Sequence, residues 1–161
     1  MKIFIAGGAG FIGSHVAQRV LKDADCERLI IYDNFTSGKD WHIADIVEDV
    51  RVNIVRADIK DLDQLVKAMA GNDMVFHFAS NPDISKAMTQ PDVDFWEGTY
   101  LTHNVLEAMR IDGVKKIIYA SGSGVYGETG YQEISEDFGP LLPISTYGAS
   151  KLAGEALINA Y

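Results

Sequence analysis

The chain has 161 residues, of which 47% are apolar and 23% charged, and a formal net charge of −9. This length suits one domain with a substantial core, and the composition excludes a disordered chain and a membrane protein. The acidic balance argues against a general nucleic-acid binder, which needs a basic face.

A single cysteine, Cys26, excludes a disulfide framework and predicts a small core residue near the second strand. The amino terminus enters an apolar strand after one lysine, which is not the pattern of a signal peptide. We therefore predict a cytoplasmic protein, with no metal site.

The first fifteen residues join a short apolar run, Lys2–Ala6, to an amphipathic stretch, Ser14–Lys22, through glycines at Gly7, Gly10 and Gly13. This pattern predicts a buried strand that turns sharply into a helix. A side chain at Gly7 would strain the turn, one at Gly10 would block a phosphate, and one at Gly13 would push the helix off the sheet. The backbone N–H groups and the helix dipole then favour a pyrophosphate.

A second apolar strand, Leu29–Tyr32, ends at Asp33, which follows Gly13 by 20 residues. An acid at this distance accepts hydrogen bonds from the adenosine ribose of a dinucleotide. Its charge repels a 2′-phosphate, so NAD is preferred to NADP. The next loop, Asn34–Lys39, is rich in turn residues and is expected to cover the adenosine end, with Ser37 and Gly38 at the cofactor.

Strand and helix patterns alternate along the rest of the chain, which predicts an α/β fold with a parallel, doubly wound, Rossmann-like sheet in three layers. The remaining predicted strands are Val52–Arg56, Asp73–Phe78 and Lys116–Ala120, and the remaining helices are Trp41–Asp49, Asp61–Ala70, Pro91–Arg110 and Ser145–Tyr161.

Residues at the carboxyl ends of these strands are candidates for ligand contacts, because ligands gather at that edge of a parallel sheet. Asp58 either caps the following helix or contacts the adenine amino group. His77 alternates with apolar neighbours and is expected to be a buried structural residue. Tyr147 and Lys151 lie four residues apart on one face of the last helix. Taken alone, they are better explained as a packing aromatic and a solvated lysine.

Seven segments in the same order make the chain resemble the N-terminal half of an extended short-chain dehydrogenase/reductase of the NAD-dependent epimerase/dehydratase family. The resemblance is greatest to nucleotide-sugar epimerases of the UDP-glucose 4-epimerase kind. The segments are Gly7–His15, Asp33–Asn34, Asp58–Ile59, His77–Ala79, Asn104–Ala108, Val125–Gly127 and Tyr147–Lys151.

The resemblance implies catalysis by transient transfer of a hydride from the sugar C4 to a retained NAD. Tyr147 would be the general acid/base, Lys151 would stabilise its phenolate and bind the nicotinamide ribose, and Ser123 would assist. A phenol is a weak base at neutral pH because its pKa is about 10, and a nearby cation favours the phenolate. The implied cofactor-binding residues are Gly7, Gly10, Phe11, Ile12, Gly13, Asp33, Asn34, Ser37, Gly38, Asp58, Ile59, Phe78, Ala79, Ser80, Tyr147 and Lys151.

Two positions depart from the family pattern. Gly122 stands where the family has a catalytic Ser or Thr, with Ser121 and Ser123 on either side as possible substitutes. Gly98 stands where a cofactor-contacting Asn is usual. Sugar 4,6-dehydratases carry an Asp-Glu pair where this chain has Ser123 and Gly124, which favours epimerisation over dehydration.

The family continues for about as many residues again, through a C-terminal substrate domain. We therefore expect residues 1–161 to be an NAD-binding domain that turns over a UDP-hexose poorly or not at all. By resemblance, the two long helices would form a homodimer. The alternatives are a related nucleotide-sugar reductase or dehydratase, and a non-catalytic NAD-binding protein.

Overall fold

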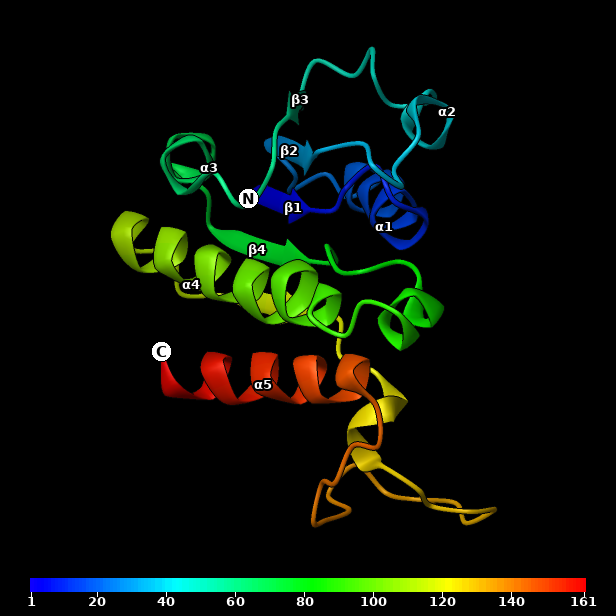
Figure 1. Ribbon diagram of the computed structural model, residues 1–161. Helices are drawn as coiled ribbons and strands as arrows, with labels where there is room; N and C mark the ends of the chain where they lie inside the picture. Colours follow the sequence, from blue (N-terminus) through cyan, green and yellow to red (C-terminus); the bar gives the residue numbers. More distant parts are fainter. The chain divides into compact units, whose positions relative to one another are not determined.

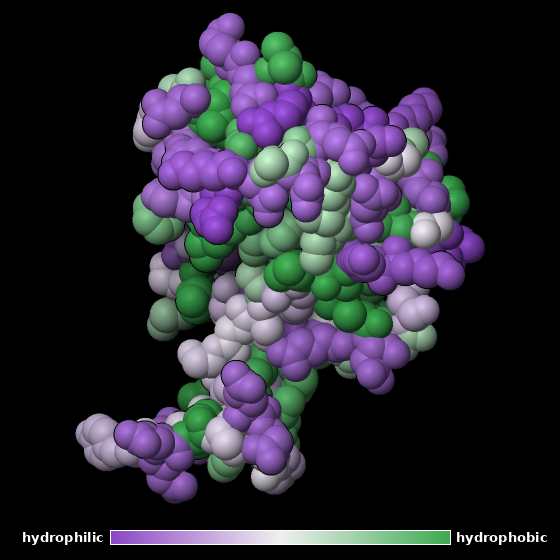
Figure 2. Space-filling view, turned by 180° about the vertical axis from the view of Figure 1, so that it is seen from behind, coloured by the Kyte–Doolittle hydropathy of each residue, from purple (hydrophilic) through white to green (hydrophobic).

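A computed structural model describes residues 1–161 and divides into two compact units. The first unit comprises residues 1–79 and 104–119, and the second comprises residues 80–103 and 120–161. Purple hydrophilic side chains cover much of the face drawn in Figure 2, and green apolar residues reach the surface among them.

A five-stranded parallel sheet forms the first unit, in the order β3-β2-β1-β4-β5. The arrows of β1 and β4 point the same way in Figure 1. The strands are β1 (Lys2–Ala6), β2 (Arg28–Asp33), β3 (Val52–Arg56), β4 (Met74–His77) and β5 (Ile117–Tyr119). The helices of this unit are α1 (Phe11–Leu21), α2 (Asp40–Ile43), α3 (Leu62–Met69) and residues 104–112 of α4 (Tyr100–Asp112).

This strand order confirms the predicted doubly wound, Rossmann-like fold. The chain moves outward from β1 to β3 and then returns to β4 on the other side of β1. Because parallel crossovers are right-handed, this reversal places α1 and α2 on one face of the sheet and the later crossover helices on the opposite face.

Alternating side chains of the central strands fill the core on both faces of the sheet. Ile3 and Ile5 of β1 lie in one cluster with Ala17 of α1 and Ile43 of α2. Phe4, on the opposite face, is fully buried and packs with its ring 5.4 Å from that of Tyr32. Cys26 is buried in the first cluster, as predicted.

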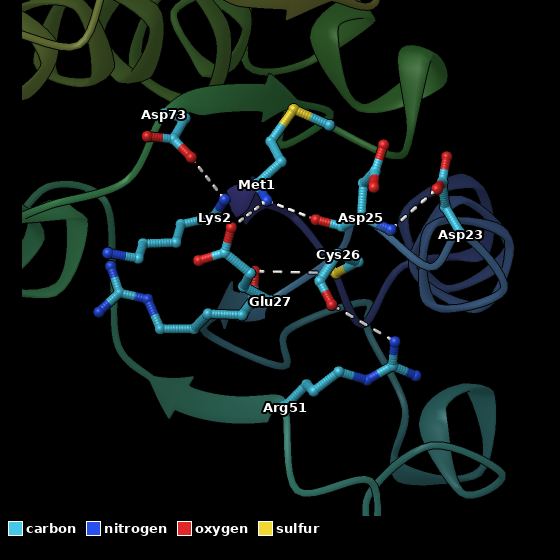
Figure 3. A network of polar contacts seen from close by, with 9 residues as sticks. Met1, Lys2, Asp23, Asp25, Cys26, Glu27, Arg51 and Asp73 are labelled. Atoms are coloured by element: carbon cyan, nitrogen blue, oxygen red, sulfur yellow. Dashed lines mark hydrogen bonds and ion pairs between the residues drawn. The ribbon is translucent and has the colours of Figure 1, made fainter.

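Polar contacts tie together the amino ends of the strands (Figure 3). The Met1 amino group lies 2.8 Å from the Glu27 carboxylate, and the Lys2 backbone N–H donates to Asp73 at 2.7 Å. Arg51 pairs with Asp49 at 2.6 Å, and this hydrogen bond lowers the pKa of the Asp49 carboxyl to about 2. The glycine-rich loop lies at the opposite edge of the sheet, where the strands end.

The second unit is built from helices and a long loop. Its elements are η1 (Ile84–Met88), η2 (Phe95–Thr99, a π-helix), η3 (Ser123–Tyr126), α5 (Thr146–Ala160) and residues 100–103 of α4. Figure 1 draws α5 as the last helix of the chain. No helix in the structure combines the length and hydropathy needed to cross a bilayer.

Two predicted helices differ from the observed ones. The helix expected over Trp41–Asp49 is only the single turn α2, followed by hydrogen-bonded turns that bury Ile46. The helix expected over Pro91–Arg110 is a π-helical segment, η2, that continues into α4 and ends at Asp112. Gly113 follows in a left-handed conformation with φ +73°, which is common for the glycine that ends a helix.

Candidate functional site

The glycine-rich loop lies between β1 and α1, as the spacing predicts. Gly7 has φ +80°, and a Cβ there would lie 2.6 Å from the Ala79 backbone nitrogen. A Cβ at Gly13 would overlap with the Gly7 carbonyl oxygen, so the first turn of α1 can approach the loop only without a side chain. A Cβ at Gly10 meets only that same oxygen, at 3.3 Å, and otherwise points into open space.

The amino end of α1 supplies backbone donors without a competing side chain. Its cap is Gly10, which offers no side-chain oxygen to the first turn. Phe11 and Ile12 are exposed at this end of the helix. Because the first N–H groups of a helix have no partner within it, this turn can receive an anion.

Asp33, at the end of β2, is the only acid of the predicted dinucleotide motif and is 8% exposed. One carboxylate oxygen accepts the Ala9 N–H at 2.9 Å, and the other accepts the Phe35 N–H at 2.8 Å. An ionised carboxylate can accept about four hydrogen bonds, so acceptor positions remain for ribose hydroxyls. The structure thus joins the ribose-binding candidate directly to the glycine-rich loop.

The loop after β2 folds back over the glycine-rich loop. Gly38 is buried, and a Cβ there would lie 2.8 Å from an Asp33 carboxylate oxygen. Asn34 and Ser37 are exposed. Phe35 adopts φ +58°, and the Arg56 guanidinium lies over its ring, 3.7 Å from the ring centre. The fold therefore brings the predicted residues of this loop to the same edge of the sheet as Asp33.

Asp58 does not cap α3, because Asp61 does so by accepting the Gln64 N–H at 3.0 Å. The Asp58 carboxylate instead accepts the Asn34 side-chain amide at 3.1 Å and the Lys60 N–H at 2.9 Å. Of the two interpretations offered by the sequence, capping is therefore wrong.

The remaining candidates of the first unit follow β3 and β4. Ile59 is buried, and its carbonyl oxygen accepts from the Asn104 side chain at 3.0 Å. The backbone N–H groups of Phe78 and Ala79 both donate to the Ala6 carbonyl, at 2.8 and 3.1 Å. His77 is fully buried with its ring 5.5 Å from that of Tyr119, as the structural interpretation expects. Ser80 opens the second unit and is half-buried.

In the second unit, Tyr147 lies in the first turn of α5. Ser145 caps this helix by accepting the Gly148 N–H at 3.0 Å. Lys151 follows one turn later, with its Nζ 5.7 Å from the centre of the Tyr147 ring. The spacing of the two residues thus does bring an ammonium group toward the phenol.

Lys151 is a buried residue, not the solvated lysine that the spacing alone also allowed. Its side chain is 3% exposed, and its Nζ donates to the Ala120 carbonyl at 2.8 Å. Removal from solvent disfavours the ammonium and lowers the pKa of Lys151 to about 8. A buried cation with a perturbed pKa beside a phenol is the arrangement expected of a functional pair.

The two serines that flank Gly122 lie in different surroundings. The Ser121 hydroxyl donates to the Glu155 carboxylate of α5, whereas Ser123 begins η3 and is exposed. A Cβ at Gly122 would meet no atom within 4 Å, and its φ of −170° is ordinary extended backbone. Packing therefore does not require glycine at this position.

A buried carboxylate holds the start of α5 in place. Asp94, 1% exposed, accepts the Thr146 hydroxyl at 2.7 Å and the Asn81 side-chain amide at 2.8 Å. Close to it, a Cβ at Gly98 would overlap with the Ser150 hydroxyl, so a larger residue there requires that hydroxyl to turn away.

Sequence reasoning missed three of these interactions: the Asp94 contacts, the Ser121–Glu155 pair and a contact of His42 with the glycine-rich loop. Their partners lie 13 to 52 residues apart in the chain, so no local spacing signals them.

Comparison with known proteins agrees with this geometry. The model of the NAD dependent epimerase/dehydratase family matches residues 3–161. The chain belongs to this family. Among curated members, it is 36% identical over 99% of its length to a putative UDP-glucose 4-epimerase of Methanocaldococcus jannaschii, and 32% identical to a UDP-glucose 4-epimerase of Mycolicibacterium smegmatis.

Solved structures of the NAD dependent epimerase/dehydratase family superpose closely on the whole chain. The UDP-glucose 4-epimerase of Thermus thermophilus, in complex with NAD, gives a TM-score of 0.87 at 32% identity over 100% of this chain. A dTDP-glucose 4,6-dehydratase of Streptomyces venezuelae gives 0.93 at 30% identity, also over 100%. The chain spans about half the length of these relatives, covering 50% and 51% of the two structures.

Proposed function

We propose that residues 1–161 form the NAD-binding domain of a nucleotide-sugar epimerase that interconverts C4 epimers of a UDP-hexose. The observation that carries this proposal is the glycine-rich loop bonded to Asp33 in the first unit. The Tyr147–Lys151 pair of the second unit supports a proton-transfer role, and the UDP-glucose 4-epimerases among the relatives support the substrate class.

The residues of the first unit fit an NAD molecule. Gly10 leaves open space beside the first turn of α1, where a diphosphate would accept backbone hydrogen bonds. Asp33 would accept the adenosine ribose hydroxyls. The other proposed cofactor contacts are those expected from the sequence: Gly7, Phe11, Ile12, Gly13, Asn34, Ser37, Gly38, Asp58, Ile59, Phe78, Ala79, Ser80, Tyr147 and Lys151.

When bound, NAD would supply the hydride acceptor and donor for the sugar C4. Tyr147 takes the proton from the 4-hydroxyl oxygen as the C–H bond breaks and gives it back as that bond re-forms. Lys151, with a pKa of about 8, is mostly protonated at neutral pH, so its charge stabilises the phenolate. Ser123 is the better candidate to bind the hydroxyl, because Ser121 donates to Glu155.

The proposal includes a cytoplasmic homodimer. Phe95 and Trp96 are 50% and 47% exposed on η2, and exposed aromatic residues next to each other favour an interface. A second candidate function is dehydration, which the similarity to the Streptomyces dehydratase supports. Gly124, where dehydratases carry an acid, counts against it. Gly122 supports a third candidate, an NAD-binding protein without catalysis.

The first test measures the intact mass of the purified protein and the absorbance of any cofactor released by heat. NAD at one equivalent per chain is expected. Interconversion of UDP-glucose and UDP-galactose is then followed by NMR, with Tyr147→Phe as the inactive control and Asn159→Ala as an exposed control on the same helix. Failure to bind NAD contradicts the proposal. Because residues 1–161 are expected to turn over a UDP-hexose poorly or not at all, the non-catalytic alternative is favoured when a full-length version binds NAD and still shows no interconversion in either direction.

A further inference from the structure

One residue of the glycine-rich loop, Ala9, is held through both of its peptide groups. Ala9 is fully buried, and its N–H donates to the Asp33 carboxylate at 2.9 Å. Its carbonyl oxygen accepts two hydrogen bonds, from the Lys39 N–H at 3.1 Å and from the His42 ring nitrogen Nδ1 at 2.7 Å. Of these three contacts, the one with Lys39 is made by backbone, and the one with Asp33 by a residue of the family motif. The His42 side chain is not part of the motifs that carry the family resemblance.

We propose that His42 is a positioning residue of the dinucleotide site, which fixes the peptide between Ala9 and Gly10. This inference rests on the proposed NAD-binding function. The Ala9 carbonyl and the Gly10 N–H belong to one planar peptide group, so anchoring the oxygen also sets the direction of the nitrogen. Gly10 is the cap of α1 and has no side chain of its own to orient that turn.

The surroundings of His42 hold its ring in place before any ligand arrives. The neighbouring Ile43 is 1% exposed in the core cluster, which anchors the single turn of α2. The Trp41 ring lies edge-on to the imidazole at 5.8 Å, and the Gln18 side chain donates to the His42 carbonyl at 3.4 Å. These contacts restrain His42 on its single helical turn beside the loop.

The contact also assigns the tautomer of His42. A carbonyl oxygen can only accept, so Nδ1 carries the proton and Nε2 of the neutral ring is bare. Two-dimensional ¹H–¹⁵N spectra of the histidine rings in the NAD-free protein are expected to show this form. A ring protonated at Nε2 alone would overturn the proposal without reference to any cofactor.

The binding test compares His42→Leu, which removes the donor, with His42→Asn, whose amide can place an N–H near the Nδ1 position. NAD affinity is measured by calorimetry at constant salt, and melting temperature is measured without NAD. Loss of one hydrogen bond is expected to weaken NAD binding about threefold to tenfold in His42→Leu. His42→Asn is expected to bind within about twofold of the wild type. His103→Leu, a histidine of the second unit, is the control.

The outcomes separate this inference from the proposed function. If the wild type does not bind NAD, the proposed function fails and the role of His42 fails with it. If the wild type binds NAD and both His42 variants bind NAD as tightly as the wild type does, only the inference is overturned. Equal weakening of both variants together with lower melting temperatures would assign His42 a purely structural role, and this too overturns it.

Discussion

Replacement of Lys151 by Met tests whether this ammonium is buried in the native protein. Methionine keeps an unbranched stem in the same space but carries no charge and cannot titrate. Lys151 is 3% exposed, and burial lowers its pKa from 10.5 to about 8. The folded state therefore holds this proton less tightly than the unfolded chain does.

The sign and size of the effect follow from linkage. Below pH 8 both states are protonated and the cost of the buried charge is present in full. As the pH rises from 8 toward 10.5, the folded state has lost the proton while the unfolded state still holds it, so stability increases. At 1.36 kcal/mol per pKa unit, the difference in unfolding free energy between wild type and Lys151→Met should shift by about 2.5 kcal/mol from pH 7 to pH 10 in favour of the wild type.

Urea unfolding of both proteins at half-unit pH steps measures this difference. Other titrating groups are common to both chains, so their contributions cancel. Lys115→Met, at an exposed position, controls for loss of one positive charge. A wild-type and Lys151→Met pair whose stabilities differ by the same amount at every pH would refute the assignment of a buried ammonium.

Three further changes test other parts of the structure. Gly13→Ala should lower both stability and NAD affinity, because its Cβ overlaps with a loop carbonyl, although alanine is favoured over glycine in helices by about 1 kcal/mol. Gly122→Ala, whose Cβ lies in open space, should lower neither. Equal melting temperatures of the two variants would contradict this. Asp94→Ala should destabilise the protein by about 2 kcal/mol in urea unfolding, since the buried Asn81 amide and the Thr146 hydroxyl both lose their acceptor, against about 1 kcal/mol for Thr146→Val; similar values would argue against a shared acceptor. Asp33→Asn should weaken NAD binding about tenfold and reduce the ratio of NAD affinity to NADP affinity, both measured by calorimetry. An unchanged ratio of the two affinities would count against a role of Asp33 in binding the ribose.

Local patterns determined the architecture of this protein. The apolar runs at Lys2–Ala6 and Leu29–Tyr32 predict buried parallel strands because every side chain of such a strand lies in a core. The spacing of the glycines predicts the turn into α1, where Gly7 and Gly13 each need the absence of a Cβ for a different steric reason. Both interpretations depend on near neighbours in the chain and were confirmed.

Helix lengths and caps were less predictable. The stretch after Trp41 carries apolar residues at helical spacing, yet Ile46 is buried from a turn that follows the single turn of α2. Two acids precede α3, and only the structure shows that Asp61 caps it while Asp58 binds Asn34. Periodicity records which side chains are apolar, but the choice between helix and turns depends on what the rest of the core leaves room for.

Asp33 could be found from its spacing to the glycine-rich loop, and Tyr147 and Lys151 from their spacing on one helix, because each spacing follows local turn or helix geometry. The environments of these residues could not. That Lys151 is buried with a lowered pKa, that Ser121 is bonded to Glu155, and that His42 holds the Ala9 carbonyl all depend on contacts between segments far apart in the chain. Burial and hydrogen bonding at these sites arise only when the strands and helices pack, so the tertiary structure alone decided them.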